Sequence, residues 1–212
     1  MGNIKGNYMI AVITGDIIQS KQHQPDQYLG RLKQLFKNIG DLIEDWEIYR
    51  GDEFQIEIPK MENALLVALL IKATIKKIST LDVRISIGLG EKTYKGKSVS
   101  ESNGPAFSYS GEQLSGMKKQ KINLLIKSED ETLDRELNII MKLGSVIWDN
   151  WSEVSAELAI IILQNPHQVQ EKIAQRLGIK QAAVSQRYKR AELALVMETE
   201  KYYRERILSI KN

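Results

Sequence analysis

Two Gly-Asp pairs carry the side chains with the clearest potential for chemistry. The first places Asp16 just after the apolar segment YMIAVIT, and the second places Asp52, beside Glu53, at the tip of the alternating stretch IYRGDEFQIEI. Carboxylates of this kind hold Mg²⁺ or Mn²⁺ together with water and phosphate oxygens. Gly-Asp is also a common hairpin turn, and a single aspartate after a strand often closes a turn or caps a helix. The chemical interpretation therefore depends on whether the fold brings the two pairs together.

The spacing of apolar residues indicates which elements position these carboxylates. The predicted order is strand 8–14, helix 25–44, strands 46–50 and 53–58, helix 61–78 and strand 82–90, followed by helix 104–119 and strand 121–127. The β-α-β-β-α-β part of this order predicts an α+β fold of the ferredoxin-like type, whose first and third strands are antiparallel neighbours. Adjacent strands lie about 4.8 Å apart. Asp16 and Asp52 are therefore expected to share a cation or a pair of cations.

The sequence changes character after residue 128. The charged run SEDETLDRE resembles the start of a helix, and the segments that follow it have helical periodicity. We therefore expect two domains: an α+β domain over residues 1–128 and a small all-α domain over residues 129–212.

The second half contains a predicted helix-turn-helix at about residues 168–192. An amphipathic helix ends at Gly178, and a second helix begins near Gln181. From Lys172 to Arg190 there are six basic residues and no acidic residue, which favours contacts with DNA phosphates. The alternative is a helical hairpin whose basic face is only solvated, or which packs against the first domain.

This segment resembles bacterial helix-turn-helix regulators, and the resemblance implies two sets of DNA contacts. Base edges would be read by Gln181, Ala182, Ser185 and Gln186. The DNA backbone would be bound by Lys180, Arg187, Lys189 and Arg190. Proteins of this type usually bind as dimers, so a homodimer is a further expectation.

The first half resembles the catalytic core of the GGDEF and class III nucleotidyl cyclases, a palm domain shared with many polymerases. The resemblance is carried by Asp16 after the first strand, by RGDEF in the hairpin, by the strand RISIGLG and by the helix GPAFSYSGEQLSGMKK. The wider pattern, with GDIIQSK and RGDEFQ, is similar to the SatD-like family of bacterial proteins. It covers about residues 8–127 and implies a nucleoside triphosphate ligand with Mg²⁺ or Mn²⁺.

Several site residues follow from this resemblance, position by position. Catalytic roles fall on Asp16, Asp52 and Glu53. The metal ligands would be Asp16, the carbonyl of Ile17, and Asp52. The triphosphate would be bound by Ile18, Gln19, Ser20, Lys21, Arg50 and Gly51. Arg50 replaces the first glycine of the GGDEF signature, where it would either clamp a phosphate or obstruct the nucleotide. The implied reaction is two-metal attack of a ribose 3′-hydroxyl with release of pyrophosphate.

The composition of the chain excludes several classes of protein. The chain has 212 residues, 42% hydrophobic and 27% charged, with a net charge of +3 and no cysteine. The absence of cysteine excludes disulfides and thiolate metal sites. Apolar runs are too short to span a membrane, and the first residues do not resemble a signal peptide, so a cytoplasmic protein with no membrane partner is expected.

Three functions are compatible with these observations. The first is a bacterial regulatory protein in which a nucleotide- and Mg²⁺-binding, cyclase-like palm is coupled to a DNA-binding helix-turn-helix. The second is an active nucleotidyl cyclase or nucleotidyltransferase. The third is a catalytically inert interaction protein.

Overall fold

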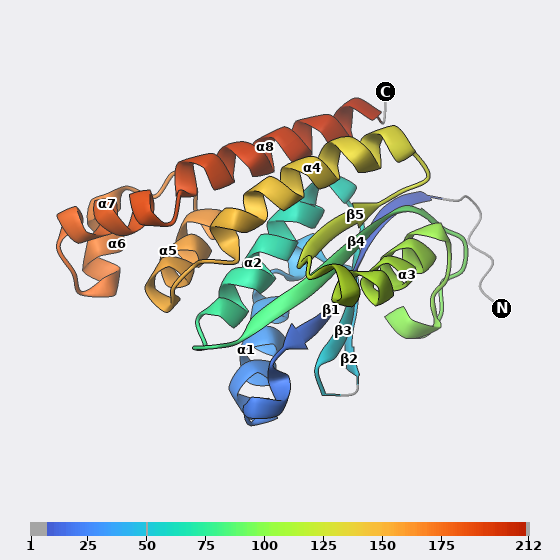
Figure 1. Ribbon diagram of the computed structural model, residues 1–212, viewed down its shortest axis with the longest axis horizontal. Helices are drawn as coiled ribbons and strands as arrows, with labels where there is room; N and C mark the ends of the chain where they lie inside the picture. The colour runs from blue at the N-terminus through green and yellow to red at the C-terminus, as the bar shows by residue number, and fades with distance from the viewer. Residues whose placement is uncertain (1–7, 50, 211–212) are drawn as a thin grey trace.

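The structure is a computed structural model that describes residues 8–49 and 51–210. It is a mixed α+β protein in which one sheet is surrounded by helices (Figure 1). The strands are β1 (Tyr8–Ile18), β2 (Asp45–Tyr49), β3 (Glu53–Ile58), β4 (Asp82–Lys92) and β5 (Leu124–Lys127). The helices are α1 (Pro25–Asn38), α2 (Ala64–Lys76), α3 (Pro105–Gln120), α4 (Glu131–Trp148), α5 (Glu153–Gln164), α6 (Gln170–Leu177), α7 (Gln181–Arg190) and α8 (Leu193–Ile210). Short 3-10 helices are η1 (Ser20–Gln22), η2 (Gly40–Leu42), η3 (Met61–Asn63) and η4 (Val99–Glu101).

The five strands are ordered β2-β3-β1-β4-β5. β1 lies at the centre and is antiparallel to both β3 and β4, whereas β4 and β5 are parallel. The predicted antiparallel pairing of the first and third strands is therefore confirmed. β1 is longer than predicted, because its pairing with β4 continues to the partners Ile18 and Asp82. Asp16 consequently lies within the strand and not beyond its end.

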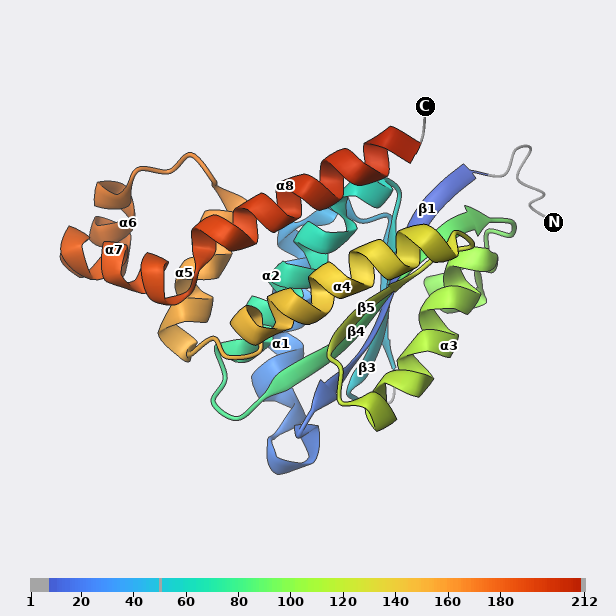
Figure 2. The same cartoon turned by 45° about the horizontal axis from the view of Figure 1, so that its top comes forward.

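Helix α3 covers one face of the sheet, and α1, α2 and α4 lie on the other (Figure 2). The approach of α3 is close because β4 presents Gly88 and Gly90 to it. A Cβ at Gly88 would collide with the carbonyl oxygen of Ala106 and lie 2.7 Å from the amide nitrogen of Ser110. The glycines of the segment GLG thus serve helix-sheet packing.

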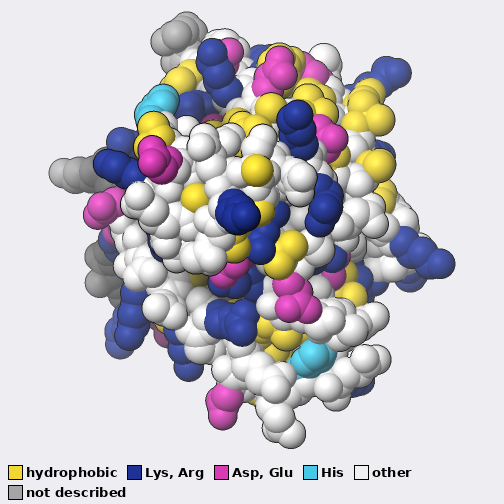
Figure 3. All heavy atoms as spheres, turned by 90° about the vertical axis from the view of Figure 1, so that its left-hand side faces the viewer, with side chains coloured by type: hydrophobic (Ala, Val, Ile, Leu, Met, Phe, Trp, Pro, Cys, Tyr) yellow, Lys and Arg dark blue, Asp and Glu magenta, His cyan; other side chains and the backbone are white. Residues whose placement is uncertain are grey.

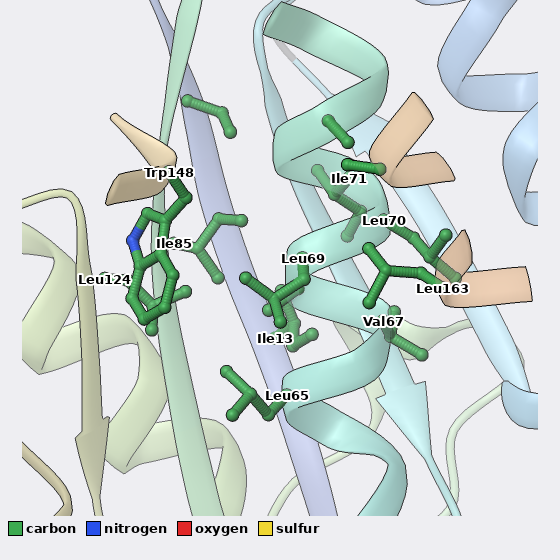
Figure 4. Close-up of a cluster of buried hydrophobic side chains, with 14 of the residues drawn as sticks. Ile13, Leu65, Val67, Leu69, Leu70, Ile71, Ile85, Leu124, Trp148 and Leu163 are labelled. Carbon is green, nitrogen blue, oxygen red and sulfur yellow. The ribbon is translucent and has the colours of Figure 1, made fainter. Parts of the chain in front are cut away.

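Helix α2 is buried on nearly every side. Eleven of its thirteen residues are buried, with Leu65 and Leu69 directed toward the sheet and Leu70 directed toward Leu163 of α5 (Figure 4). Helices α5 and α8 cover the side of α2 that faces away from the sheet. The main hydrophobic core therefore continues across the proposed domain boundary at residue 128, and the division into two domains remains a prediction.

A single lysine is buried within this apolar helix. The side chain of Lys72 is 1% exposed, and its Nζ lies 2.7 Å from Asp82 and also pairs with Asp149 at the end of α4. Asn123, just before β5, donates to Asp149 at 3.0 Å. A buried ammonium is tolerated only when it is paired, so Lys72 fixes the start of β4 and the end of α4 against α2.

Tyr203 connects α8 to η3, the short 3-10 helix just before α2. Its ring is fully buried, and its hydroxyl donates to the carbonyl of Met61 at 2.9 Å. Burial raises the pKa of Tyr203 far above its ordinary value, and the charges of Glu62 and Glu200 raise it further.

In the described residues, no helix is both long enough and apolar enough to cross a membrane.

The contact between α3 and β4 predicts opposite effects for two glycine substitutions. Gly88→Ala should lower the free energy of unfolding by about 1–3 kcal/mol, because the new methyl group overlaps the α3 backbone. Gly30→Ala, in the open interior of α1, should raise it by about 0.5–1 kcal/mol through helix propensity. Urea unfolding of both variants measures this, and equal stability of the two would contradict the close packing.

The burial of Tyr203 predicts a specific loss of stability at high pH. Above its ordinary pKa of 10.0 the phenol ionises in the unfolded chain but stays protonated in the folded one, so the unfolded state is favoured. Between about pH 9 and pH 11, wild-type protein should lose about 1.4 kcal/mol more stability than Tyr203→Phe. Denaturant unfolding at each pH provides the comparison. Parallel pH profiles would show that Tyr203 ionises freely in the folded protein.

Candidate functional site

Asp16 lies in a row of charged residues that crosses three strands. In the sheet register its partners are Glu53 on β3 and Arg84 on β4. Its side chain is 10% exposed, and both carboxylate oxygens accept hydrogen bonds of 2.8 Å from Nη1 of Arg84. Nζ of Lys118, near the end of α3, lies 3.3 Å from the same carboxylate. The charge of Asp16 is therefore balanced by two cations from the protein itself.

Asp52 has a different set of partners. It follows Gly51, whose φ of +80° suits the left-handed turn between β2 and β3. The carbonyl of Asp52 accepts a hydrogen bond from the amide of Ile17 at 3.0 Å, and its carboxylate accepts one from the hydroxyl of Ser20 at 2.8 Å. Tyr28 of α1 donates to the carbonyl of Gly51 at 3.1 Å.

The hydrogen bond between Ile17 and Asp52 holds the backbone at Asp52 close to the end of β1. The residue directly opposite Asp16 on β3 is nevertheless Glu53. The pKa of Tyr28 is raised, chiefly by burial and also by the nearby charge of Asp52. The hydrogen bond from Tyr28 to Gly51 places this turn beside α1, whereas Asp16 pairs with Lys118 of α3.

The residues expected to bind a triphosphate lie around the end of β1. Ile18 and Gln19 line a cavity, and Gln19 adopts a left-handed conformation with φ of +66°. Ser20 is buried and its hydroxyl is bound to Asp52, while Lys21 is exposed. Arg50 lies outside the described residues. The ligand roles of all these residues, and the catalytic roles of Asp16, Asp52 and Glu53, remain predictions.

The cavity at the end of β1 has a volume of about 610 Å³ and is rich in cations. We call it the cationic cavity. Four basic side chains line it: Lys76 from α2, Arg84 from β4, Lys118 from α3 and Lys121 after α3. Asp82 and Glu153 also line it, but Asp82 is already paired with Lys72 and lies 3.7 Å from Lys76. The cavity can therefore attract an anion.

Polar side chains between the sheet and α3 form a group of hydrogen bonds beside the cationic cavity. Thr14 shares a hydrogen bond of 2.8 Å with Ser110, and Gln55 donates to Thr14 at 3.2 Å. Ser86 donates to Gln113 at 2.9 Å. These contacts hold β3, β1, β4 and α3 together on the face where Asp16 lies.

Sequence reasoning missed the role of Arg84 and gave little weight to Lys118. A charged residue inside the apolar strand DVRISIGLG was a usable signal, because alternate residues of a strand share one face. Asp16 and Arg84 become neighbours only through the β1–β4 register, which the sequence alone does not specify.

The two aspartates expected to hold a metal ion are bound by other side chains of the protein. No group of three or more His, Cys, Asp or Glu side chains within residues 8–49 and 51–210 could hold a metal ion. Arg84 occupies both oxygens of Asp16, and Ser20 engages Asp52. An ion held between Asp16 and Asp52 would compete with Arg84 and Ser20 for these carboxylates. Whether Mg²⁺ or Mn²⁺ accompanies a ligand remains a prediction.

Helices α6 and α7 form the predicted pair of helices joined by a short turn. Gly178 has φ of +64°, and the amide of Ile179 donates to the carbonyl of Ala174 at 3.0 Å. Val184 is the buried residue of α7. Most of the expected DNA contacts are exposed, namely Lys180, Gln181, Ala182, Gln186, Lys189 and Arg190, whereas Ser185 and Arg187 are half-buried. Arg187 lies 3.9 Å from Glu157 of α5.

Fold and site together define a mixed α+β protein with a cation-lined cavity at one end of its central strand. The sequence matches the SatD family over residues 9–207, and the chain belongs to that family. No curated protein is significantly similar to the sequence. The structure of a bacterial light-regulated adenylyl cyclase is similar with a TM-score of 0.41 and 11% identity, over 57% of this chain and 43% of that chain.

Proposed function

We propose that this protein binds a phosphorylated nucleotide in the cationic cavity and binds DNA through α6 and α7, as a bacterial regulatory protein. The observation that carries the proposal is the convergence of Lys76, Arg84, Lys118 and Lys121 on one cavity. Its volume of about 610 Å³ is within the usual range for small-molecule sites. The strand order β2-β3-β1-β4 supports the finer assignment of this half to a ferredoxin-like, cyclase-type palm.

The lysines and the arginine have different parts in this proposal. The side chain of Lys118 is 58% exposed, so it can turn from Asp16 to a phosphate at low cost. Arg84 is 12% exposed and remains bound to Asp16, which orients its guanidinium toward the cavity. Asp16 then competes with the ligand for Lys118. Because this arrangement neutralises Asp16 without an added ion, phosphate binding is expected with or without Mg²⁺.

An enzymatic role as a nucleotidyl cyclase or nucleotidyltransferase is the alternative. This role requires that the wild-type protein form a new nucleotide product and that the Asp52→Asn variant fail to form it. Mass spectrometry of each nucleoside triphosphate after incubation, with and without Mg²⁺ or Mn²⁺, distinguishes a binding protein from an enzyme.

Nucleotide binding predicts a contrast between neighbouring lysines of α3. Lys118→Gln should weaken binding of ATP or GTP about tenfold, because it removes one charge-assisted hydrogen bond to a phosphate. Lys119→Gln is the matched control, since Lys119 is exposed on the same helix but does not line the cavity. Asp16→Asn should tighten binding about two- to tenfold by releasing Lys118. Isothermal titration calorimetry measures all three.

Two results would contradict this account of the cavity. The first is the absence of saturable binding of any nucleoside triphosphate to the wild-type protein. The second is weaker binding by Asp16→Asn that appears only in the presence of Mg²⁺, which would favour the metal-ligand role of Asp16.

The exposure of the basic residues of α7 is the observation that supports DNA binding. Replacing Lys189 and Arg190 with Gln should lower the slope of log K against log salt by about 2 for duplex DNA, because each side chain would neutralise one phosphate. The charge-matched control replaces Lys142 of α4 and Lys201 of α8, which are exposed elsewhere. Fluorescence anisotropy at several salt concentrations gives the slopes. An unchanged slope in the α7 variant would exclude this face as the DNA contact.

A further inference from the structure

The cationic cavity continues into two further hollows between the sheet-containing half and α5. A hollow of about 390 Å³ shares Ile78 and Glu153 with the cavity. A third hollow, of about 500 Å³, shares Arg31 and Lys77 with the second one and reaches Arg176 on α6. Neighbouring hollows have lining residues in common and therefore adjoin one another, and we call the three together the basic groove. It leads from the end of β1 past α1 and α5 to α6.

Cations outnumber acids along the basic groove. Its basic lining residues are Lys76, Lys77, Arg31, Arg84, Lys118, Lys121 and Arg176. Its acidic lining residues are Asp82, Glu153 and Glu157. Two of these acids have lysine partners, because Asp82 pairs with Lys72 and Glu157 lies 3.2 Å from Lys77. The groove therefore has an excess of positive charge along its length.

Arg31 and Arg176 are the cations of the basic groove most available to a ligand. Both are exposed. Arg31 has a weak contact, 3.4 Å, from its guanidinium to the carbonyl of Lys77. Figure 3 views the end of the molecule formed by α5, α6 and α7, where Lys and Arg side chains lie across the surface, including a group near the centre. An extended anion in the groove would leave it at this basic end.

We propose that the basic groove binds a single strand of nucleic acid, with successive phosphates along Arg31, Lys77 and Arg176. A spaced series of cations suits a regularly spaced polyanion better than one compact anion. Each hollow has the volume of a small-molecule site, which matches a single nucleotide of a flexible strand. The groove is thus distinct from the exposed face of α7 proposed to contact duplex DNA.

Contacts with the phosphate backbone of the nucleic acid should dominate its recognition by the basic groove. The aromatic residue that lines the cationic cavity is Trp151, which is 4% exposed and whose indole N–H is bound to the carbonyl of Ala191 at 3.0 Å. Its ring is therefore a poor platform for stacking. Binding should depend steeply on salt and show little preference among bases.

The test measures anisotropy of a labelled oligothymidylate of about twelve nucleotides, a length typical of single-strand sites. The groove variant carries Arg31→Gln and Arg176→Gln. The control carries Lys33→Gln and Lys37→Gln, which remove the same charge from exposed positions of α1 outside the groove. We expect the groove variant to bind at least about tenfold more weakly, with a salt slope lower by about 1.4, and the control to remain within about twofold of wild type.

Two further measurements separate this proposal from the proposed function. The groove variant should keep its affinity for ATP or GTP, because neither Arg31 nor Arg176 lines the cationic cavity, and the α7 variant should keep its affinity for the single strand. Absence of oligonucleotide binding by the wild type, or equal weakening in the control, would overturn the proposal. So would equal affinity for a polyglutamate peptide of matched charge, since the groove would then recognise charge alone.

Discussion

An α-helix that is apolar on every side must be covered on every side, and α2 imposes this condition on the whole molecule. The sheet covers one side, while α5 and α8 cover the other. Burial of an aliphatic side chain contributes about 1.5–3 kcal/mol, so leaving the outer side of α2 in water would be severely destabilising. The helices that follow residue 128 are therefore part of the same core as the sheet, although their sequence has a different character.

Lys72 fixes the alignment of α2 with β4 and with the end of α4. Apolar side chains can slide against one another, but an ammonium buried among them must meet Asp82 and Asp149. Asp82 begins β4, which contains Arg84, and Asp149 follows α4, near Trp151 and Glu153 on the wall of the cationic cavity. The relative positions of cavity residues that are distant in sequence thus depend on one ion-pair cluster.

The sequence was sufficient for the order of elements and for the antiparallel pairing of β1 with β3, because these follow from periodicity and short connections. It was not sufficient for the neighbours of Asp16. Strand β1 continues for four residues beyond the predicted end at residue 14, and in this register Asp16 lies opposite Arg84 and Glu53. Strand length is set by the partner strand as much as by local pattern. The hydrophobicity of ALLVALLI indicated a buried helix, but what covers it depends on tertiary packing.

The position of α2 also has a consequence for synthesis of the chain. Its outer side is covered by residues of α5 and α8. Tyr203 of α8 donates a hydrogen bond to Met61, which lies 142 residues earlier in the sequence. At ordinary translation rates, α2 emerges on the order of ten seconds before the residues that cover it. During this interval the nascent chain exposes a strongly apolar helix beside an incomplete sheet. A general chaperone is therefore expected to bind this segment at the ribosome, before the protein has any ligand to recognise.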